Sequence, residues 1–418
     1  MQARNGYQLS RLAALGVLAG SAWTLACAEN PVGAEPAADQ LASRFVITND
    51  EATLARRVVP QPKDTFAIAP VGSAVVAAGV MPGDAGGRDI TLRLVSESEV
   101  LPPEVDGQRL QASHIVTWAS RAYVGYNVAG PARFGGIDVF RLNDSEAKLI
   151  SQAVASGVDV GAVGDGQTEV YLAAAFDDEA MASPAALVEI ALSGGKLTNE
   201  IRVVDLPSYA ATSVVRDGEA VFVTTGSSED GGLFRLDATG LGVTAVDHHL
   251  DARGVAVGSD RVVTMSGTPG TIRVYDLAGT ALGAYEIGGA SAPEAKSMVA
   301  VADGFAYAAA GEAGIVVLRL SDGAVVAQVP MAAMTDDVNA DAVTNGIAIN
   351  QDLVFAANGG AGLFALHIAM DGGDPVLEPI GRVVMPEASS VNAVASHSNR
   401  LFVATGNGGL QIVQIASH

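Results

Sequence analysis

Short apolar runs recur along the chain in a fixed order. From about residue 64 to the C-terminus, one apolar run is followed by a turn, a second run that ends in small residues and Gly, and a third run. The clearest copies cover residues 298–320 and 345–368. The runs are four to seven residues long, rich in Val, Ile and Ala, and bounded by Gly, Asp, Asn and Ser, which is typical of strands and turns and not of a helical period. We therefore expect an all-β chain.

Strand repeats of this length indicate a β-propeller of four-stranded blades. We count eight copies and predict eight blades, with seven as the alternative because the first and third copies are degenerate. The last copy stops after its third strand, at residues 410–415. Its fourth strand must come from elsewhere, and residues 44–49 or 54–59 are the candidates. Pairing this N-terminal strand with 410–415 would close the ring and remove an exposed edge.

Composition narrows the class of partner. The 418 residues are 49% hydrophobic but 5% aromatic, and they include 48 glycines, which suits a large core joined by many tight turns. The formal charge is −22, from 24 basic and 46 acidic residues. Because this charge repels phosphate backbones and anionic lipid headgroups, we expect no nucleic-acid partner. Solubility and attraction of a cation or basic partner both remain explanations for the charge.

The first 26 residues have the pattern of an export signal. Arg4 and Arg11 precede an apolar stretch over residues 12–25 that is short for a membrane span. The only cysteine, Cys27, follows this stretch and Ala26. The segment resembles the lipobox of bacterial lipoproteins, which implies that Cys27 is lipidated and begins the mature chain. Thr24 stands where that motif has Leu, and cleavage by the ordinary signal peptidase, which would give a secreted protein, is the alternative.

These observations divide the chain into three parts. Residues 1–26 form the signal peptide, 27–41 a flexible tether rich in Ala, Pro and Glu, and 42–418 the propeller domain. The lost segment carries two arginines and no acidic residue, so the mature charge would be −22 − 2 = −24. A lipid anchor alone would then hold the protein at the outer membrane or in the periplasm. We expect a monomer. No second cysteine exists, so the mature domain should have no disulfide.

One family shares the repeat. The run VAVADGFAYAAAGEAGIVVLRLSD, from Val299 to Asp322, and the closing copy over residues 392–415 resemble the LVIVD-repeat propellers of bacterial surface and secreted proteins. The similarity covers about residues 64–418 and implies the propeller fold. It implies little about function. The acidic residue that ends the third strand in that family is kept at Asp276 but often replaced, as at Ser321 and Ala416.

Polar residues just ahead of the predicted innermost strands should surround the mouth of the central channel. Arg253 and Lys296 stand in adjacent copies and could bind a carboxylate or phosphate group. A channel mouth that is simply wet and polar is the alternative interpretation. The candidates are His114, Asp159, Thr212, Arg253, Lys296, Asn345 and Asn392.

The links between second and third strands differ between the two halves of the chain. They are long in the first four copies, over residues 80–89, 127–135, 176–184 and 226–231, and tight in the later ones. Long loops on one side of a rigid frame often carry recognition, although neutral drift explains them nearly as well. The candidate loop residues are Asp84, Arg88, Arg133, Phe134, Asp177 and Asp178.

Signals for metal binding or catalysis are weak. Asp337, Asn339 and Asp341 alternate like the start of a calcium loop, but Ala342 and Ala348 replace the glycine and glutamate of that loop, which favours a solvated acidic turn. We recognise no nucleophile elbow, zinc helix or phosphate loop. We therefore predict no cofactor, with calcium as a weak candidate. The predicted function is a membrane-anchored binding or scaffolding module with a ligand or protein partner at the channel face, and a calcium-dependent hydrolase or lactonase is the alternative.

Overall fold

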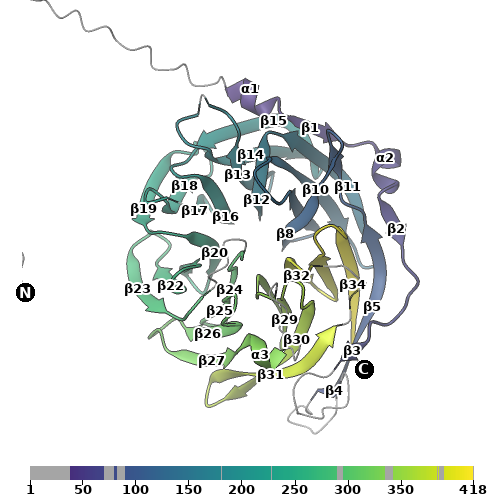
Figure 1. Cartoon of the computed structure of the whole chain (residues 1–418), viewed down its shortest axis with the longest axis vertical. Helices are drawn as coiled ribbons and strands as arrows, with labels where there is room; N and C mark the ends of the chain where they lie inside the picture. Colours follow the sequence, from purple (N-terminus) through teal and green to yellow (C-terminus); the bar gives the residue numbers. More distant parts are fainter. Residues whose placement is uncertain are drawn as a thin grey trace, which may run out of the picture. The chain divides into compact units, whose positions relative to one another are not determined.

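A computed structural model describes residues 38–69, 80–81, 90–179, 181–226, 228–289, 295–334, 342–383, 385 and 390–417. The chain divides into residues 1–34 and 35–418, and all the described residues lie in the second unit. In its described residues, seven four-stranded antiparallel sheets form the blades of a ring around a central channel (Figure 1). The protein is therefore a β-propeller, and the preferred count of eight blades is wrong while the alternative of seven is confirmed.

Each of the first six blades takes four consecutive strands, counted from the channel outward. Blade 1 comprises β8 (Gln111–Trp118), β9 (Arg121–Asn127), β10 (Phe134–Leu142) and β11 (Ala147–Ser156), and blade 2 comprises β12 (Val158–Asp165), β13 (Glu169–Phe176), β14 (Ala185–Ser193) and β15 (Lys196–Asp205). Blade 3 comprises β16 (Ala210–Asp217), β17 (Ala220–Gly226), β18 (Gly232–Asp237) and β19 (Val243–His248), and blade 4 comprises β20 (Ala252–Gly258), β21 (Arg261–Ser266), β22 (Thr271–Tyr275) and β23 (Ala281–Glu286). Blade 5 comprises β24 (Val299–Ala302), β25 (Phe305–Ala309), β26 (Ile315–Arg319) and β27 (Val325–Val329), and blade 6 comprises β28 (Gly346–Asn350), β29 (Leu353–Ala357), β30 (Leu363–Asp371) and β31 (Asp374–Val383).

Blade 7 closes the ring with strands from both ends of the domain. Its inner strands are β32 (Ala393–His397), β33 (Arg400–Ala404) and β34 (Leu410–Ser417), and its fourth strand is β5 (Ile90–Val100). The register pairs Leu410 with Val100 and Ile415 with Leu94. An N-terminal strand thus closes the ring, but neither predicted segment pairs with 410–415. The first sequence copy supplies this strand and does not form a blade of its own.

The segment ahead of β5 lies against the outside of four blades, and we call residues 38–69 the belt. Helix α1 (Ala38–Ala42) contacts β15, β1 (Phe45–Thr48) pairs with β11, and α2 (Glu51–Ala55) contacts β11. Strand β2 (Val58–Pro60) then pairs with β5, and β3 (Ile68–Ala69) pairs with β31. The two segments expected to close the ring therefore add outer strands to blades 1 and 7. The short elements β4 (Val80–Met81), β6 (Glu104–Val105), β7 (Gln108–Arg109) and α3 (Met331–Met334) complete the described structure.

Buried ion pairs hold the belt against blade 1 and join the strands that close the ring in blade 7. Both terminal nitrogens of Arg57 donate to the Asp138 carboxylate, at 2.8 and 2.7 Å, and Tyr126 donates its hydroxyl to the same group at 2.7 Å. Arg400 of blade 7 donates to Glu97 of β5 at 2.7 Å and to the Asn143 carbonyl of blade 1 at 2.7 Å. The side chain of Asp138 is fully buried and that of Arg400 is 3% exposed, so each pair is held away from water.

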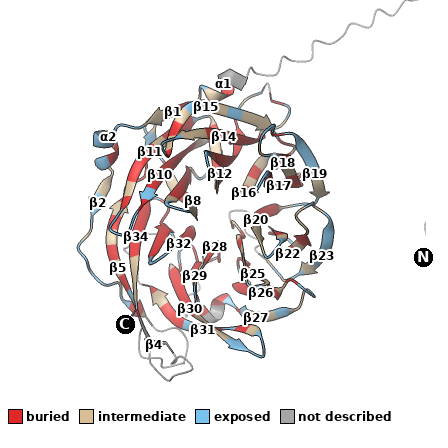
Figure 2. Cartoon of the chain, turned by 180° about the vertical axis from the view of Figure 1, so that it is seen from behind, coloured by how far each residue is buried: buried red, intermediate tan, exposed pale blue. Residues whose placement is uncertain are grey.

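The core lies between neighbouring blades. The second strands β17, β25, β29 and β33 are buried at every residue, while the outermost strands β19 and β23 are mainly exposed (Figure 2). Small residues such as Ala and Gly on the inner strands let seven blades converge on one channel. The ends of these strands therefore lie close enough together to form a shared site.

Candidate functional site at the channel mouth

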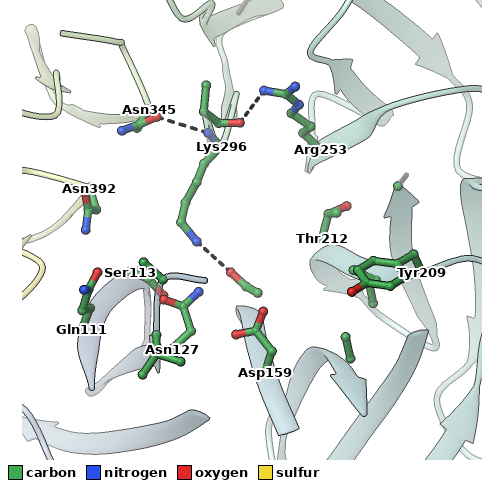
Figure 3. Close-up of a pocket in the computed structure, with 18 of the residues that line it drawn as sticks. Gln111, Ser113, Asn127, Asp159, Tyr209, Thr212, Arg253, Lys296, Asn345 and Asn392 are labelled. Atoms are coloured by element: carbon green, nitrogen blue, oxygen red, sulfur yellow. Dashed lines mark hydrogen bonds between the residues drawn. The ribbon is translucent and has the colours of Figure 1, made fainter. Parts of the chain in front are cut away.

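A cavity of about 610 Å³ opens at the end of the channel where the innermost strands begin (Figure 3). All seven blades contribute to its lining. The polar lining residues, in chain order, are Gln111, Ser113, Asn127, Asp159, Tyr209, Thr212, Asp251, Arg253, Lys296, Asn345 and Asn392. Six of the seven predicted channel-mouth residues are among them, and His114 is not.

Four innermost strands carry a β-bulge at the cavity. The register with the second strand shifts between Ala112 and His114, and at the equivalent place in β12, β16 and β20. The residues skipped by these shifts are Ser113, Gly161, Thr212 and Arg253, and all four line the cavity. A bulge adds one residue to a strand and re-aims the side chains around it. The bulges therefore turn the start of blades 1 to 4 toward the channel.

Lys296 reaches across the channel. It precedes β24 in blade 5, and its Nζ donates a hydrogen bond of 3.1 Å to the Gly161 carbonyl in blade 2 (Figure 3). Its backbone N–H donates to Asn345 Oδ1 at 3.2 Å, which fixes the start of the side chain. Burial lowers the pKa of Lys296 and the nearby Asp159 carboxylate opposes that shift. No carboxylate within the described residues forms a salt bridge with this ammonium group.

Asp159 supplies the negative charge next to Lys296. Its Oδ1 is buried and accepts no hydrogen bond from the described residues. Burial raises the pKa of this carboxyl, while the charges of Lys296 and Arg133 offset part of the shift. The cavity thus holds two opposite charges that lie near each other without being paired.

The second pair of opposite charges at the cavity, Arg253 and Asp251, forms a direct ion pair. Arg253 donates from Nε and from one terminal nitrogen to the two carboxylate oxygens of Asp251, both at 2.8 Å, and from the other to the Ala295 carbonyl at 2.5 Å. A Cβ on Gly267 would lie 2.1 Å from this guanidinium, so only glycine leaves room for it. Arg253 is therefore already held by the protein and is not the free anion-binding group that the sequence predicts.

The neutral polar residues of the cavity also divide into those with a hydrogen-bond partner in the protein and those without one. Thr212 Oγ1 donates to the Ala252 carbonyl at 2.8 Å, and Asn392 donates to the Ala112 carbonyl at 3.2 Å. Gln111 and Asn127 line the cavity with no side-chain hydrogen bond to another described residue. Gln111 and Ser113 were missed by the sequence analysis, which placed the blade 1 contribution at His114. Asn127 was included only as the first residue of the long loop 127–135.

His114 points away from the cavity because of the bulge at Ser113. It is 6% exposed, and its Nδ1 accepts a hydrogen bond of 3.2 Å from the Val163 N–H of blade 2. Burial, with a smaller contribution from Lys296, lowers the pKa of His114 to about 3. A neutral imidazole thus joins blades 1 and 2.

The rim of the cavity carries an exposed aromatic ring. Tyr209 is 57% exposed, and the guanidinium of Arg133 lies 4.9 Å from the centre of its ring. Arg133 also donates to the Phe176 carbonyl, so it spans from the loop of blade 1 to the edge of blade 2. The predicted residue Arg133 thus acts on the cavity through Tyr209, which the sequence analysis did not single out.

Other predicted loop residues lie elsewhere. Phe134 begins β10 and packs against the core cluster of blades 1 and 7. Arg44 of the belt donates to Asp178 Oδ2 at 2.7 Å and to the Asp177 carbonyl at 3.0 Å. This loop therefore holds the belt. The candidates Cys27, Asp84, Arg88, Asp337, Asn339 and Asp341 lie outside the described residues.

Two features are absent from the described part of the chain. No group of three or more His, Cys, Asp or Glu residues there is arranged to hold a metal ion. No helix there has the length and apolar character needed to cross a membrane.

Comparisons with known proteins show the fold. No protein family model matches the sequence, and no curated protein matches it either. Among solved structures, a catalytically inactive virginiamycin B lyase from Staphylococcus aureus with quinupristin is 10% identical, with a TM-score of 0.52 over 78% of this chain and 100% of that one. The WD40 β-propeller domain of Doa1 is 13% identical, with a TM-score of 0.50 over 75% and 96%. A chain of the mitotic checkpoint complex is 11% identical, with a TM-score of 0.52 over 83% and 96%. At these identities the likeness establishes the β-propeller fold and says nothing about activity or ligand.

Proposed function

We propose that this protein is an exported binding module whose ligand occupies the cavity at the channel mouth. The observation that carries the proposal is the unpaired couple of Lys296 and Asp159 inside a 610 Å³ cavity. Buried polar groups normally have partners, and an unmet acceptor costs about 1–3 kcal/mol. Cavities of this size with a few convergent polar groups are typical small-molecule sites.

The cellular setting is part of the same proposal. A lipid on Cys27 would anchor the module, and residues 27–41 would let it reach a ligand away from the membrane. The resemblance of the repeats to LVIVD-repeat propellers of bacterial surface and secreted proteins supports an extracytoplasmic location. Labelling of the wild type with radioactive palmitate, and loss of the label in Cys27→Ser, tests the anchor; equal labelling of both would contradict it.

A thermal-shift screen tests the binding function. We expect at least one compound of a diverse metabolite collection to raise the Tm of the wild type by several degrees, because a ligand that binds only the folded state stabilises it. The same compound should not shift Lys296→Met. Lys148→Met is the matched control, since Lys148 lies on the outer strand β11 and should leave the shift intact. Compounds that shift both variants equally, or a screen without any shift, would contradict binding in this cavity.

A further inference from the structure

The geometry points to a saccharide as the ligand, with neighbouring hydroxyls that bridge Lys296 and Asp159 and a ring that lies beside Tyr209. This inference rests on the proposed function and adds the chemical class of the ligand. Several polar groups of the cavity keep donors or acceptors that no described residue uses.

The unused groups form one set. Lys296 uses one N–H for the Gly161 carbonyl, which leaves two N–H donors of its ammonium group. Asp159 lines the cavity, so its carboxylate is an acceptor within reach of a ligand, and its Oδ1, which is shielded from solvent, has no donor among the described residues. The amides of Gln111 and Asn127 each add donors and acceptors. Since Arg253, Thr212 and Asn392 already have partners, the remaining groups give the ligand a site that both donates and accepts hydrogen bonds.

Charge balance favours a neutral ligand. Asp159 and Asp251 match Arg253 and Lys296 among the lining residues, so the cavity has no net charge. The chain as a whole carries −22, which repels anions that approach the mouth. A ligand with one sign of charge would satisfy either Lys296 or Asp159 and leave the other without a partner. The penalty for that unmet group would reduce its affinity.

Vicinal hydroxyls meet both demands at once. One hydroxyl can donate to Asp159 while its neighbour accepts from Lys296, and hydrogen bonds to charged groups are the stronger kind. The exposed ring of Tyr209, kept in place by Arg133, offers a flat apolar surface beside these polar groups. A sugar ring has a matching apolar face and a polar edge. The cavity volume is sufficient for a mono- or disaccharide.

The test uses the full chain and named probes. Fluorescently labelled protein is incubated with an array of immobilised glucose, mannose, galactose, N-acetylglucosamine and fucose and their common disaccharides. The strongest binder is then titrated as a free sugar by calorimetry, together with its O-methylated and deoxy analogues. We expect binding by the wild type, and an affinity at least about tenfold lower for Asp159→Asn and for Lys296→Met. Gln111→Ala serves as a further cavity variant should either of these fail to fold.

The outcomes separate this inference from the proposed function. Binding that falls in the cavity variants, persists in Lys148→Met and weakens for one of the deoxy analogues supports the saccharide. Sugar binding that is unchanged in Asp159→Asn and Lys296→Met would place the sugar elsewhere and overturn it. Free amino acids or carboxylates that bind through Lys296 while no sugar on the array binds would also overturn it, but they would leave the cavity as the binding site. If no compound of any class depends on Lys296, both the inference and the proposed function fail.

Discussion

Blades 1 to 4 and blades 5 to 7 line the same channel, but they begin their innermost strands differently. In blades 1 to 4 a bulge interrupts the strand at the cavity. In blades 5 to 7 the strands β24, β28 and β32 pair without a shift. The bulged blades supply most of the cavity lining, and the regular blades add little beyond Lys296, Asn345 and Asn392. The bulged blades thus shape most of the cavity, while the regular blades contribute its ammonium group, Lys296, and two amides.

In the regular half, blades 5 to 7, the link between the second and third strands has the same structure in each blade. Each link from second to third strand in blades 5 to 7 has two glycines at positive φ, and those nearer the third strand are Gly314, Gly362 and Gly409, at 83°, 94° and 81°. Backbone bridges join Gly311 to Thr344 and Gly359 to Val391, and so tie each link to the next blade. Such a link leaves no loop to shape a ligand site. In blades 5 to 7 these links therefore join neighbouring blades and do not enlarge the cavity.

The largest expected change in the free energy of unfolding comes from a buried ion pair of the bulged half, compared with more exposed pairs in the regular half. Arg57→Met removes the cation from the buried Asp138 of blade 1, and we expect a loss of about 3–5 kcal/mol in the free energy of unfolding. Arg319→Met removes pairs with Asp322 and Asp374, which are much more exposed, so we expect no resolvable loss. Urea unfolding followed by circular dichroism measures both. Equal losses would show that burial does not distinguish these pairs.

The fold was largely predictable because strand repeats have a simple signal. Runs of Val, Ile and Ala between Gly and Asp identified the propeller and most of its strands. The blade count failed at the first copy, because residues 90–94 look like any third strand and only the ring shows that they complete blade 7. The partner of 410–415 is set by tertiary pairing. A local pattern cannot choose among 44–49, 54–59 and 90–100, since each of the three contains strand residues ahead of blade 1.

A smaller effect is expected from the glycines of the links. A Cβ at Gly409 would lie 2.2 Å from the Val100 carbonyl of β5, and φ is 81° there. We expect Gly409→Ala to cost roughly 3 kcal/mol, from left-handed strain and a backbone clash. Gly130 in the blade 1 loop has a φ of 100°, but a Cβ added there would have no described atom within 4 Å. Gly130→Ala should therefore cost only about 1–2 kcal/mol. Thermal unfolding of the two variants compares them, and a reversed order would contradict the distinction between the halves.

The site was harder to predict than the fold because bulges have little sequence signal. Six of the seven residues singled out ahead of the apolar runs line the cavity: Asp159, Thr212, Arg253, Lys296, Asn345 and Asn392. In blade 1 the bulge shifts the inward position by one, so Ser113 faces the cavity where His114 was expected. Tyr209 carries a usable hint, since a lone aromatic residue precedes a small-residue inner strand. Asp251, two residues earlier in the chain, pairs with Arg253. This pairing depends on side-chain geometry, so the sequence did not predict it.

The bulge in blade 1 should have a measurable consequence for pH dependence. His114 has a folded pKa of about 3, below its ordinary value near 6.5, so the unfolded chain binds the proton more readily. Its contribution to stability is complete above pH 6.5 and is lost as the pH falls toward 3. Between pH 7 and 4.5 this amounts to roughly 2–3 kcal/mol. His114→Gln keeps an acceptor for the Val163 N–H, and its urea unfolding should depend less on pH than that of the wild type. Parallel pH profiles would show that His114 is not held neutral in the fold.

The smallest expected change in stability comes from Asp159, whose carboxylate lies at the cavity in the bulged half. The pKa of Asp159 is raised by burial, so its ionised form destabilises the fold at pH 7, and that penalty disappears as the pH falls below the raised pKa. Asp159→Asn should therefore stabilise the protein at pH 7, by about 1 kcal/mol or less, with the gain vanishing in acid. Asp237→Asn is the control of opposite sign, because hydrogen bonds from Thr239 and Gly240 lower the pKa of Asp237 to about 2.

Thermal unfolding across pH compares the two aspartate variants. Removing the ionised group at Asp237 should lower stability at pH 7, whereas the same chemical change at Asp159 should raise it. If Asp159→Asn instead destabilises the protein, the carboxylate serves the frame, and the distinction between a structural half and a binding half loses its main support. A gain in stability would mean that the ionised Asp159 destabilises the fold. Binding residues often lower stability in this way, because they are arranged for the ligand and not for the folded chain alone.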